Sequence, residues 1–101
     1  MDYSLAIVGG RLVSDPEREE GEIPVAAFDV VTTRKWTKKD GTKSEAKTTI
    51  HVRTERRLAE ICLQFLKKGR GVLVVGRFEE RSGSYVLAAD TVQFLDGRKE
   101  E

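Results

Sequence analysis

One helical pattern, flanked on both sides by β-like segments, most strongly constrains how this chain of 101 residues can fold. Its apolar residues recur at the spacing of a single helix face and are Leu58, Ile61, Cys62, Phe65 and Leu66. Thr54 is expected to cap the start of this helix. Lys67 and Lys68 favour the negative end of the helix dipole, and Gly69 is expected to terminate the helix. The pattern therefore predicts one helix between Thr54 and Gly69.

The segments around this helix have the short apolar runs and turn residues that are typical of strands. Three strands are expected before the helix and two after it, at about 3–13, 24–33, 46–53, 71–78 and 85–95. Gly9-Gly10 is expected to mark a bulge or sharp bend, and 17–22 a polar turn. Five strands with a helix between the third and fourth predict an all-β OB-fold, a five-stranded Greek-key barrel. An SH3-like or other small β-sandwich is the alternative, but such folds do not normally place a helix there.

The composition fits one globular domain with a charged surface, since 39% of the residues are apolar and 35% are charged. Residues 1–96 are expected to form the barrel domain, and 97–101 a short charged C-terminal end. Cys62 is the only cysteine, which excludes an intramolecular disulfide and favours a reducing compartment. No secretory signal pattern is present, and the longest apolar run, Val72–Val75, is far too short for a membrane span. We therefore expect a cytoplasmic protein with no membrane contact.

Charge is distributed unevenly along the chain, although 18 basic and 17 acidic residues give a formal net charge of only +1. The segment from Arg34 to Arg57 holds nine basic and three acidic residues, and the segment from Asp15 to Glu22 holds five acidic residues against Arg18 alone. Asp40-Gly41, inside the basic segment, is a strong signal for a hairpin turn. A basic hairpin can bind a polyanion even in a near-neutral chain, and the alternative is a solvated loop.

Six stretches fall in the same order as the motifs of a known family. They are Val8–Leu12 with Asp15-Pro16-Glu17, Ile23–Phe28, Trp36 with Lys39-Asp40-Gly41, Leu58–Ile61 with Leu66–Gly69, Val74–Phe78 and Ala89–Leu95. Together they resemble the DNA-binding domain of bacterial single-stranded DNA-binding proteins, in a short form that lacks the acidic C-terminal tail. The resemblance implies an OB-fold that binds single-stranded DNA without strong sequence preference. It also implies a role in DNA replication, recombination and repair, a nucleoid-associated location, and a homo-oligomer in which a tetramer is favoured over a dimer.

The chain departs from that family at several positions. Ile50 stands before His51, where the family often has an aromatic residue. Thr54–Arg57 replaces an approach to the helix that usually carries a Phe or Trp, and the last hairpin, Glu79–Ser84, carries two acids in place of a basic stretch and a tryptophan. Primosomal replication protein N is a short relative that binds DNA mainly through basic residues. An accessory role that acts mainly through protein–protein contacts with replication or recombination proteins is therefore the alternative function, and RNA binding is another.

The candidate DNA-binding residues are cations and aromatics in and around the basic hairpin and the last two strands. Trp36 among lysines and arginines suits a platform on which bases stack, at about 1–3 kcal/mol per base; the alternative is a partly exposed Trp packed on the barrel. For Phe78 the alternative is a core position, and for Tyr85 core and binding are equally supported. The full set is Arg34, Lys35, Trp36, Lys38, Lys39, Lys43, Arg53, Arg56, Arg57, Arg70, Arg77, Phe78, Arg81 and Tyr85.

No set of residues in the sequence supports catalysis, so we expect no enzyme, no cofactor and no metal. His51 is the only histidine and is expected to be a hydrogen-bonded strand or interface residue, and Cys62 is expected in the core. With one His, one Cys and no Cys-x-x-Cys spacing, a metal site is not expected. Asp29 and Asp90 could form a carboxylate pair, but nothing in the sequence brings them together. The glycines also lack the spacing of a phosphate-binding loop.

Overall fold

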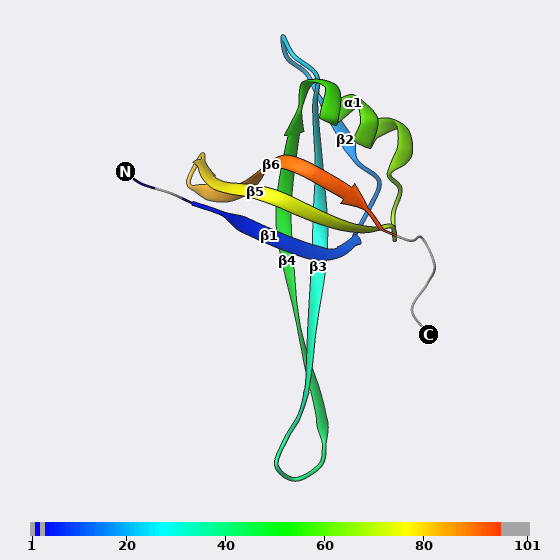
Figure 1. Cartoon of the computed structure of the whole chain (residues 1–101), viewed down its shortest axis with the longest axis vertical. Helices are drawn as coiled ribbons and strands as arrows, with labels where there is room; N and C mark the ends of the chain where they lie inside the picture. Colours follow the sequence, from blue (N-terminus) through cyan, green and yellow to red (C-terminus); the bar gives the residue numbers. More distant parts are fainter. Residues whose placement is uncertain (1, 3, 96–101) are drawn as a thin grey trace.

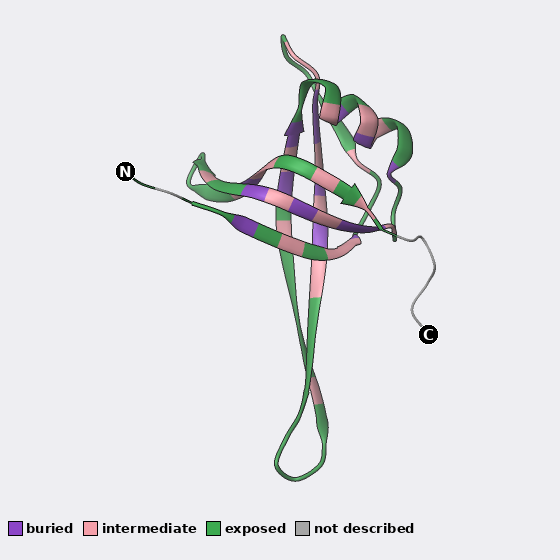
Figure 2. Cartoon of the chain, viewed as in Figure 1, coloured by how far each residue is buried: buried purple, intermediate pink, exposed green. Residues whose placement is uncertain are grey.

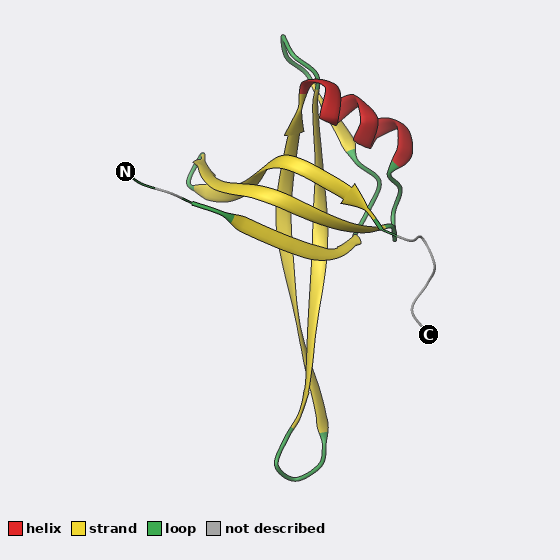
Figure 3. Ribbon diagram, viewed as in Figure 1, coloured by secondary structure: helices red, strands yellow, loops and turns green. Residues whose placement is uncertain are grey.

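A computed structural model describes residue 2 and residues 4–95, and the short charged end expected at 97–101 lies outside the described residues. The described part consists of strands and one helix (Figures 1 and 3). In chain order these are β1 (Ala6–Leu12), β2 (Glu17–Glu19), β3 (Val25–Thr37), β4 (Lys43–Glu55), α1 (Arg56–Phe65), β5 (Gly71–Arg81) and β6 (Ser84–Phe94).

Five of these strands close into a barrel. Their order is β1-β5-β6-β4-β3, and a further pairing of β1 with β3 closes the ring. All of these pairings are antiparallel except β4 with β6, which is parallel and joins only Val52 to Leu87 and Arg53 to Ala88. The helix lies between the third and fourth barrel strands and crosses one end of the barrel (Figure 3). The predicted OB-fold is therefore confirmed.

Alternating side chains build the core of the barrel. On β3 the inward-facing residues Ala26, Phe28 and Val30 are almost completely buried, and they lie beside Val52 of β4. Cys62, from the middle of α1, is also fully buried, which confirms its predicted place in the core. The core cluster comprises Ala6, Leu12, Phe28, Val30, Val52, Cys62, Leu66, Val72, Val74 and Leu87.

Gly10 of β1 marks a close approach of two strands, and neither glycine of this strand forms a bulge. The ladder between β1 and β5 runs without a break from Ala6 to Arg11. A Cβ at Gly10 would lie 2.2 Å from the Val31 carbonyl oxygen of β3, so only glycine fits where β1 turns from β5 to β3. The bulge in the barrel is on β6, since Gly76 pairs with Ala89 although Val75 pairs with Thr91.

The ends of the helix differ from the prediction. Thr54 does not cap it, because the Thr54 hydroxyl is buried and donates to the Ala26 carbonyl at 3.1 Å, which joins β4 to β3. The helix begins after Glu55 with no side-chain cap and ends at Phe65. Lys67 and Lys68 therefore lie beyond the last turn and do not face the helix dipole as predicted. Leu66 is drawn into the core with an extended backbone, and this ends the helix before Gly69.

Strand β2 was not predicted from the sequence. Glu17–Glu19 pairs with Ala27–Val25 on the outer edge of β3, and all three of its side chains are exposed. The segment therefore has no apolar periodicity, which is the signal that reveals a strand in a sequence. Main-chain pairing with β3 makes it a strand, so the prediction of a polar turn was wrong for these three residues.

The β3–β4 hairpin is longer than predicted and projects from the barrel (Figures 1 and 2). Thirteen residue pairs join the two strands, from Val25 with Glu55 to Thr37 with Lys43. At the tip, the Asp40 carboxylate accepts hydrogen bonds from the Thr42 hydroxyl at 2.7 Å and the Thr42 amide at 3.0 Å. These two bonds hold the pKa of the Asp40 carboxyl below its usual range.

Candidate nucleic-acid interface

Trp36 lies on β3 in the projecting part of the hairpin, away from the core cluster. Its side chain is 39% exposed. Because Trp36 pairs with Ser44 near the far end of the ladder, its position contradicts the alternative of a partly exposed Trp packed on the barrel. Arg34, two residues earlier on the same side of β3, places its guanidinium 4.7 Å from the centre of the indole ring. The guanidinium thus lies over one face of the indole ring, and both side chains are exposed.

Exposed lysines surround Trp36 on the hairpin. Lys35 and Lys43 lie on the side opposite Trp36, because successive side chains of a strand alternate. Lys38 and Lys39 lie in the turn, where the Lys38 amide donates to the Thr42 carbonyl at 2.7 Å. A hollow of about 520 Å³ is lined by Lys35, Trp36, Thr37, Lys43, Ser44 and Glu45. The structure thus brings together the predicted residues of the hairpin, which are Arg34, Lys35, Trp36, Lys38, Lys39 and Lys43.

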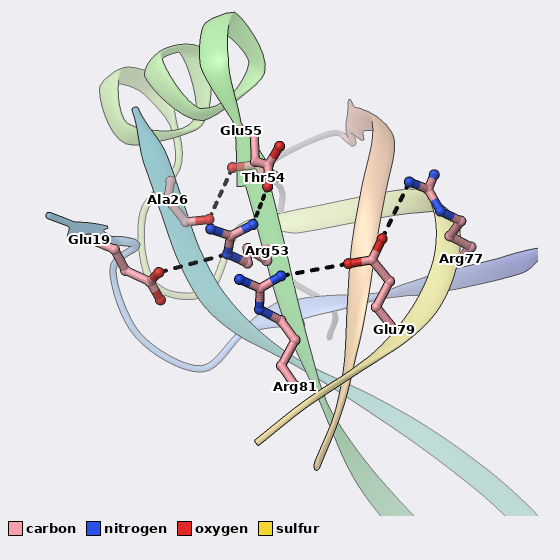
Figure 4. A network of polar contacts seen from close by, with 8 residues as sticks. All are labelled: Glu19, Ala26, Arg53, Thr54, Glu55, Arg77, Glu79 and Arg81. Carbon is pink, nitrogen blue, oxygen red and sulfur yellow. Dashed lines mark hydrogen bonds and ion pairs between the residues drawn. The ribbon is translucent and has the colours of Figure 1, made fainter. Parts of the chain in front are cut away.

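Arg53 lies on β4, close to the parallel seam with β6, and is already paired with carboxylates. Its side chain is only 17% exposed and lies between Glu55, with which it forms a short ion pair, and Glu19 of β2, at 3.8 Å (Figure 4). The sequence suggested that this arginine was available to a phosphate. The structure instead shows it held between two acidic side chains.

The β5–β6 hairpin separates its arginines from its aromatic residues. Arg77 and Arg81 lie on the outer side, where both pair with Glu79 (Figure 4). Phe78 and Tyr85 lie on the other side of the same two strands, because Phe78 pairs with the buried Leu87. Both aromatic side chains are exposed, at 44% and 68%, so the core interpretation is wrong for them.

The remaining predicted arginines have different environments. Arg56 and Arg57 are exposed at the start of α1, and Arg56 has a left-handed backbone (φ +62°) fixed by a hydrogen bond from its amide to the Pro24 carbonyl. Arg70 donates to the Leu95 carbonyl at 3.0 Å and lies over the Phe94 ring. Arg70 therefore secures the end of β6 and does not join the other predicted site residues.

Two grooves flank Arg53 along the seam between β4 and β6, with volumes of about 260 and 290 Å³. His51 lines the second groove and its Nδ1 lies 2.6 Å from the Asp29 carboxylate, which confirms the predicted hydrogen-bonded strand residue. Asp90 pairs instead with Arg77 at 3.2 Å, so Asp29 and Asp90 have separate partners. The charged residues that line the grooves are four arginines (Arg53, Arg56, Arg77 and Arg81) and five acids (Glu19, Asp29, Glu55, Glu79 and Asp90).

The seam is therefore nearly balanced in charge, in contrast to the basic hairpin. The acids that balance it come from five different strands, β2 to β6, and are far apart in the sequence. A search of the sequence for clusters of basic residues does not detect acids that lie far from these arginines in the chain. Sequence reasoning therefore identified the seam arginines but missed the carboxylates that pair with them.

Comparison with known proteins identifies the family. The model of the Single-strand binding protein family matches residues 4–95. The chain belongs to this family. A relative named single-stranded DNA-binding protein, from Neisseria meningitidis serogroup A, is 33% identical over 112 residues, which cover 99% of this chain and 64% of the relative. One with the same name from Caldanaerobacter subterraneus subsp. tengcongensis is 35% identical and covers 89% of this chain and 66% of the relative.

Solved structures agree on the fold. A deletion mutant of the single-stranded DNA binding protein from Thermus aquaticus superposes with a TM-score of 0.80 at 21% identity, covering 95% of this chain and 52% of the other. A Plasmodium falciparum SSB in complex with single-stranded DNA gives a TM-score of 0.81 at 17% identity, covering 95% and 97%. The present chain spans 64% of the length of the Neisseria relative, which is less than two thirds.

Neither a membrane-spanning helix nor a metal-binding cluster is found in the part of the chain that the structure describes. The helix α1 there is too short to cross a membrane. In the same residues, no three His, Cys, Asp or Glu side chains are grouped so that they could hold a metal ion.

Proposed function

We propose that this chain binds single-stranded DNA without strong sequence preference and acts in DNA replication, recombination or repair, without enzymatic activity. The observation that carries the proposal is the exposed Trp36–Arg34 pair on a basic hairpin that projects from the barrel. Family membership and the names of the relatives support it.

In this proposal bases stack on Trp36, and lysines along the hairpin bind phosphates. Stacking needs only the π face that every base has, so it does not select a sequence, and it contributes about 1–3 kcal/mol per base. Lys38 and Lys39 are exposed in the turn and can neutralise phosphates beside the stacked base, and the exposed Lys35 and Lys43 can bind phosphates on the opposite side of the hairpin. Each neutralised phosphate lowers the affinity by roughly 0.7 log units per log unit of salt.

We further propose that the protein is cytoplasmic and nucleoid-associated and works as a homo-oligomer, a tetramer rather than a dimer. The resemblance to the family supports this assembly. Sedimentation velocity measures the oligomer directly, and a monomer at micromolar concentration would contradict it.

An accessory role through protein–protein contacts is the second candidate function. The charge-balanced seam favours it, since four arginines there face five acids and can attract phosphate only weakly. This candidate predicts DNA binding that is weak and nearly independent of salt. It also predicts stable complexes with replication or recombination proteins.

Fluorescence of Trp36, the only tryptophan, tests the proposal directly. The protein is titrated with a dT oligomer of about thirty nucleotides, which exceeds the site size of one OB-fold, and with duplex DNA and a U oligomer of the same length. We expect strong quenching by the dT oligomer, relieved by salt, and little quenching by the duplex. Equal quenching by the U oligomer would extend the ligand to RNA. No quenching and no change in the anisotropy of a labelled dT oligomer would contradict the proposal.

A further inference from the structure

The outer side of the β5–β6 hairpin carries two arginines that share the Glu79 carboxylate, and Arg77 also pairs through its other terminal nitrogen with Asp90 at 3.2 Å. The Glu79 carboxylate lies 3.3 Å from the Arg77 guanidinium and 3.8 Å from the Arg81 guanidinium (Figure 4). All three side chains remain partly open to solvent, with exposed fractions of 52%, 47% and 36% for Arg77, Arg81 and Glu79. The group is therefore accessible to a large anionic ligand.

This arrangement has the donors of a phosphate site. Guanidinium groups bind carboxylates and phosphates through the same fork of N–H donors. Two arginines on either side of one anion could hold a phosphodiester group as readily as the Glu79 carboxylate. Exposed ion pairs of this kind are weak in water, so a phosphate can displace the carboxylate.

The position on the barrel also suits a nucleic-acid strand. Arg81 and Arg53 line one groove of the seam, and Arg77 and Glu79 line the other. The strand β4 runs from this seam into the basic hairpin. Lys43, on the side of the hairpin opposite Trp36, shares its side of β4 with His51 and Arg53. A single strand held by the lysines on that side could thus continue along β4 towards Arg81.

We propose that Arg77 and Arg81 form a second site for the phosphate backbone of single-stranded DNA, and that Glu79 occupies this site in the free protein and so limits the affinity. The inference rests on the proposed function, because its ligand is the same single strand. Glu79 is thus an internal competitor of the ligand, and its removal strengthens binding.

A matched pair of variants tests this inference. Glu79→Gln removes the shared carboxylate, and Glu80→Gln makes the same charge change one residue later, on the opposite side of β5. Anisotropy of a labelled dT oligomer gives the affinity across a salt series. We expect Glu79→Gln to bind about two- to fivefold more tightly at low salt, the range expected from releasing an exposed ion pair. Its salt dependence should steepen by about 0.7 log units per added phosphate, whereas Glu80→Gln should stay close to wild type.

A second variant assigns the gain to the two arginines. Adding Arg77→Ala and Arg81→Ala to Glu79→Gln should abolish both the tighter binding and the steeper salt dependence. Equal gains from Glu79→Gln and Glu80→Gln would overturn the inference, because they would reflect net charge alone. Weaker binding by Glu79→Gln would also overturn it, because Glu79 would then position the arginines and not compete with the ligand.

Failure of the proposed function gives a different pattern. In that case the wild-type protein neither binds the dT oligomer nor shows Trp36 quenching. If Glu79→Gln also fails to bind, the inference falls as well. If Glu79→Gln binds where the wild type does not, the second site stands without the hairpin site.

Discussion

The two halves of the β3–β4 hairpin share one continuous ladder but differ in what surrounds it. Near the barrel, alternate residues such as Phe28, Val30 and Val52 are buried in the core. From Thr33 outward nearly every side chain is exposed, although the strands stay paired to Thr37 and Lys43 (Figure 2). Main-chain pairing is thus the same in both halves, and only the side-chain environment changes.

This difference separates stability from binding within one supersecondary element. The inner half is stabilised by burial of apolar surface, at roughly 25 cal/mol per Å². The outer half depends on hydrogen bonds and cross-strand pairs, each contributing about 0.2–1 kcal/mol. Substitutions in the inner half should therefore change the free energy of unfolding, and those in the outer half should change ligand affinity.

The largest expected effect is in the barrel. Leu87 is fully buried and pairs with Val52 across the seam. Leu87→Ala should lower the free energy of unfolding by about 2–5 kcal/mol, because it removes buried methyl groups and leaves a cavity. Urea unfolding measures this loss, and DNA binding below the unfolding transition should stay near wild type. A fall in affinity as large as the fall in stability would show that the two halves are not separable.

The next effect is in the outer half of the hairpin. Trp36→Ala should weaken binding of a dT oligomer by about 1–3 kcal/mol, the contribution of one stacked base. Trp36→Phe is the matched control, because it keeps an aromatic face and should retain most of the affinity. Anisotropy gives the affinities and thermal unfolding gives the stability, which should barely change. A large drop in melting temperature for Trp36→Ala would instead assign this residue to the fold.

A smaller effect is expected from the buried thiol of the barrel. Burial raises the pKa of Cys62 from 9.0 to about 11, against a weaker opposing hydrogen bond with Thr54. As the pH rises from 9 to 11 the unfolded chain loses this proton and the folded chain retains it, so the free energy of unfolding falls. Urea unfolding across this window should show the decline, with Cys62→Ala as the control that lacks this contribution. Identical slopes for both proteins would contradict the assignment.

The smallest effect is at the hairpin tip. Asp40→Ala removes both hydrogen bonds to Thr42, and should speed amide exchange of Thr42 without changing the melting temperature. The same loosening is expected in the wild type at low pH. The lowered pKa of Asp40 means that its contribution is present above 3.8 and is lost as the carboxylate becomes protonated below that value. Unchanged exchange in Asp40→Ala would show that the turn is held by Gly41 and main-chain bonds alone.

The barrel could be predicted from the sequence because its elements carry local signals. The period of the helix, the apolar runs of the strands and Asp40-Gly41 each reflect a nearby physical preference. Strand β2 could not be predicted, because exposed residues give no periodic signal. The cap was wrong for a similar reason, since Thr54 bonds to Ala26, a residue 28 positions earlier.

The candidate site was likewise predictable from the sequence only where its residues are neighbours in the chain. The basic hairpin was visible because its cations and Trp36 are contiguous in the sequence. The pairing of Arg53 with Glu19, and the separation of Arg77 from Phe78 by the faces of β5, depend on how the strands are arranged. Whether an arginine is available to a phosphate was therefore not predictable from its neighbours in the chain.

The strand order also has a consequence for how the protein is made. The ladder between β3 and β4 joins neighbours in the chain, and hairpins of this kind form in about 1–10 μs. Strand β1 must wait for β5, since Arg11 pairs with Gly71 and Ala6 with Gly76, and such distant pairings bring folding times to about milliseconds to seconds. On the ribosome the nascent chain therefore holds most of β1, from Ala6 to Gly10, unpaired until β5 has emerged, and only Arg11 and Leu12 can pair earlier, with β3. We expect the β3–β4 hairpin to fold first and to serve as the template on which the other strands assemble.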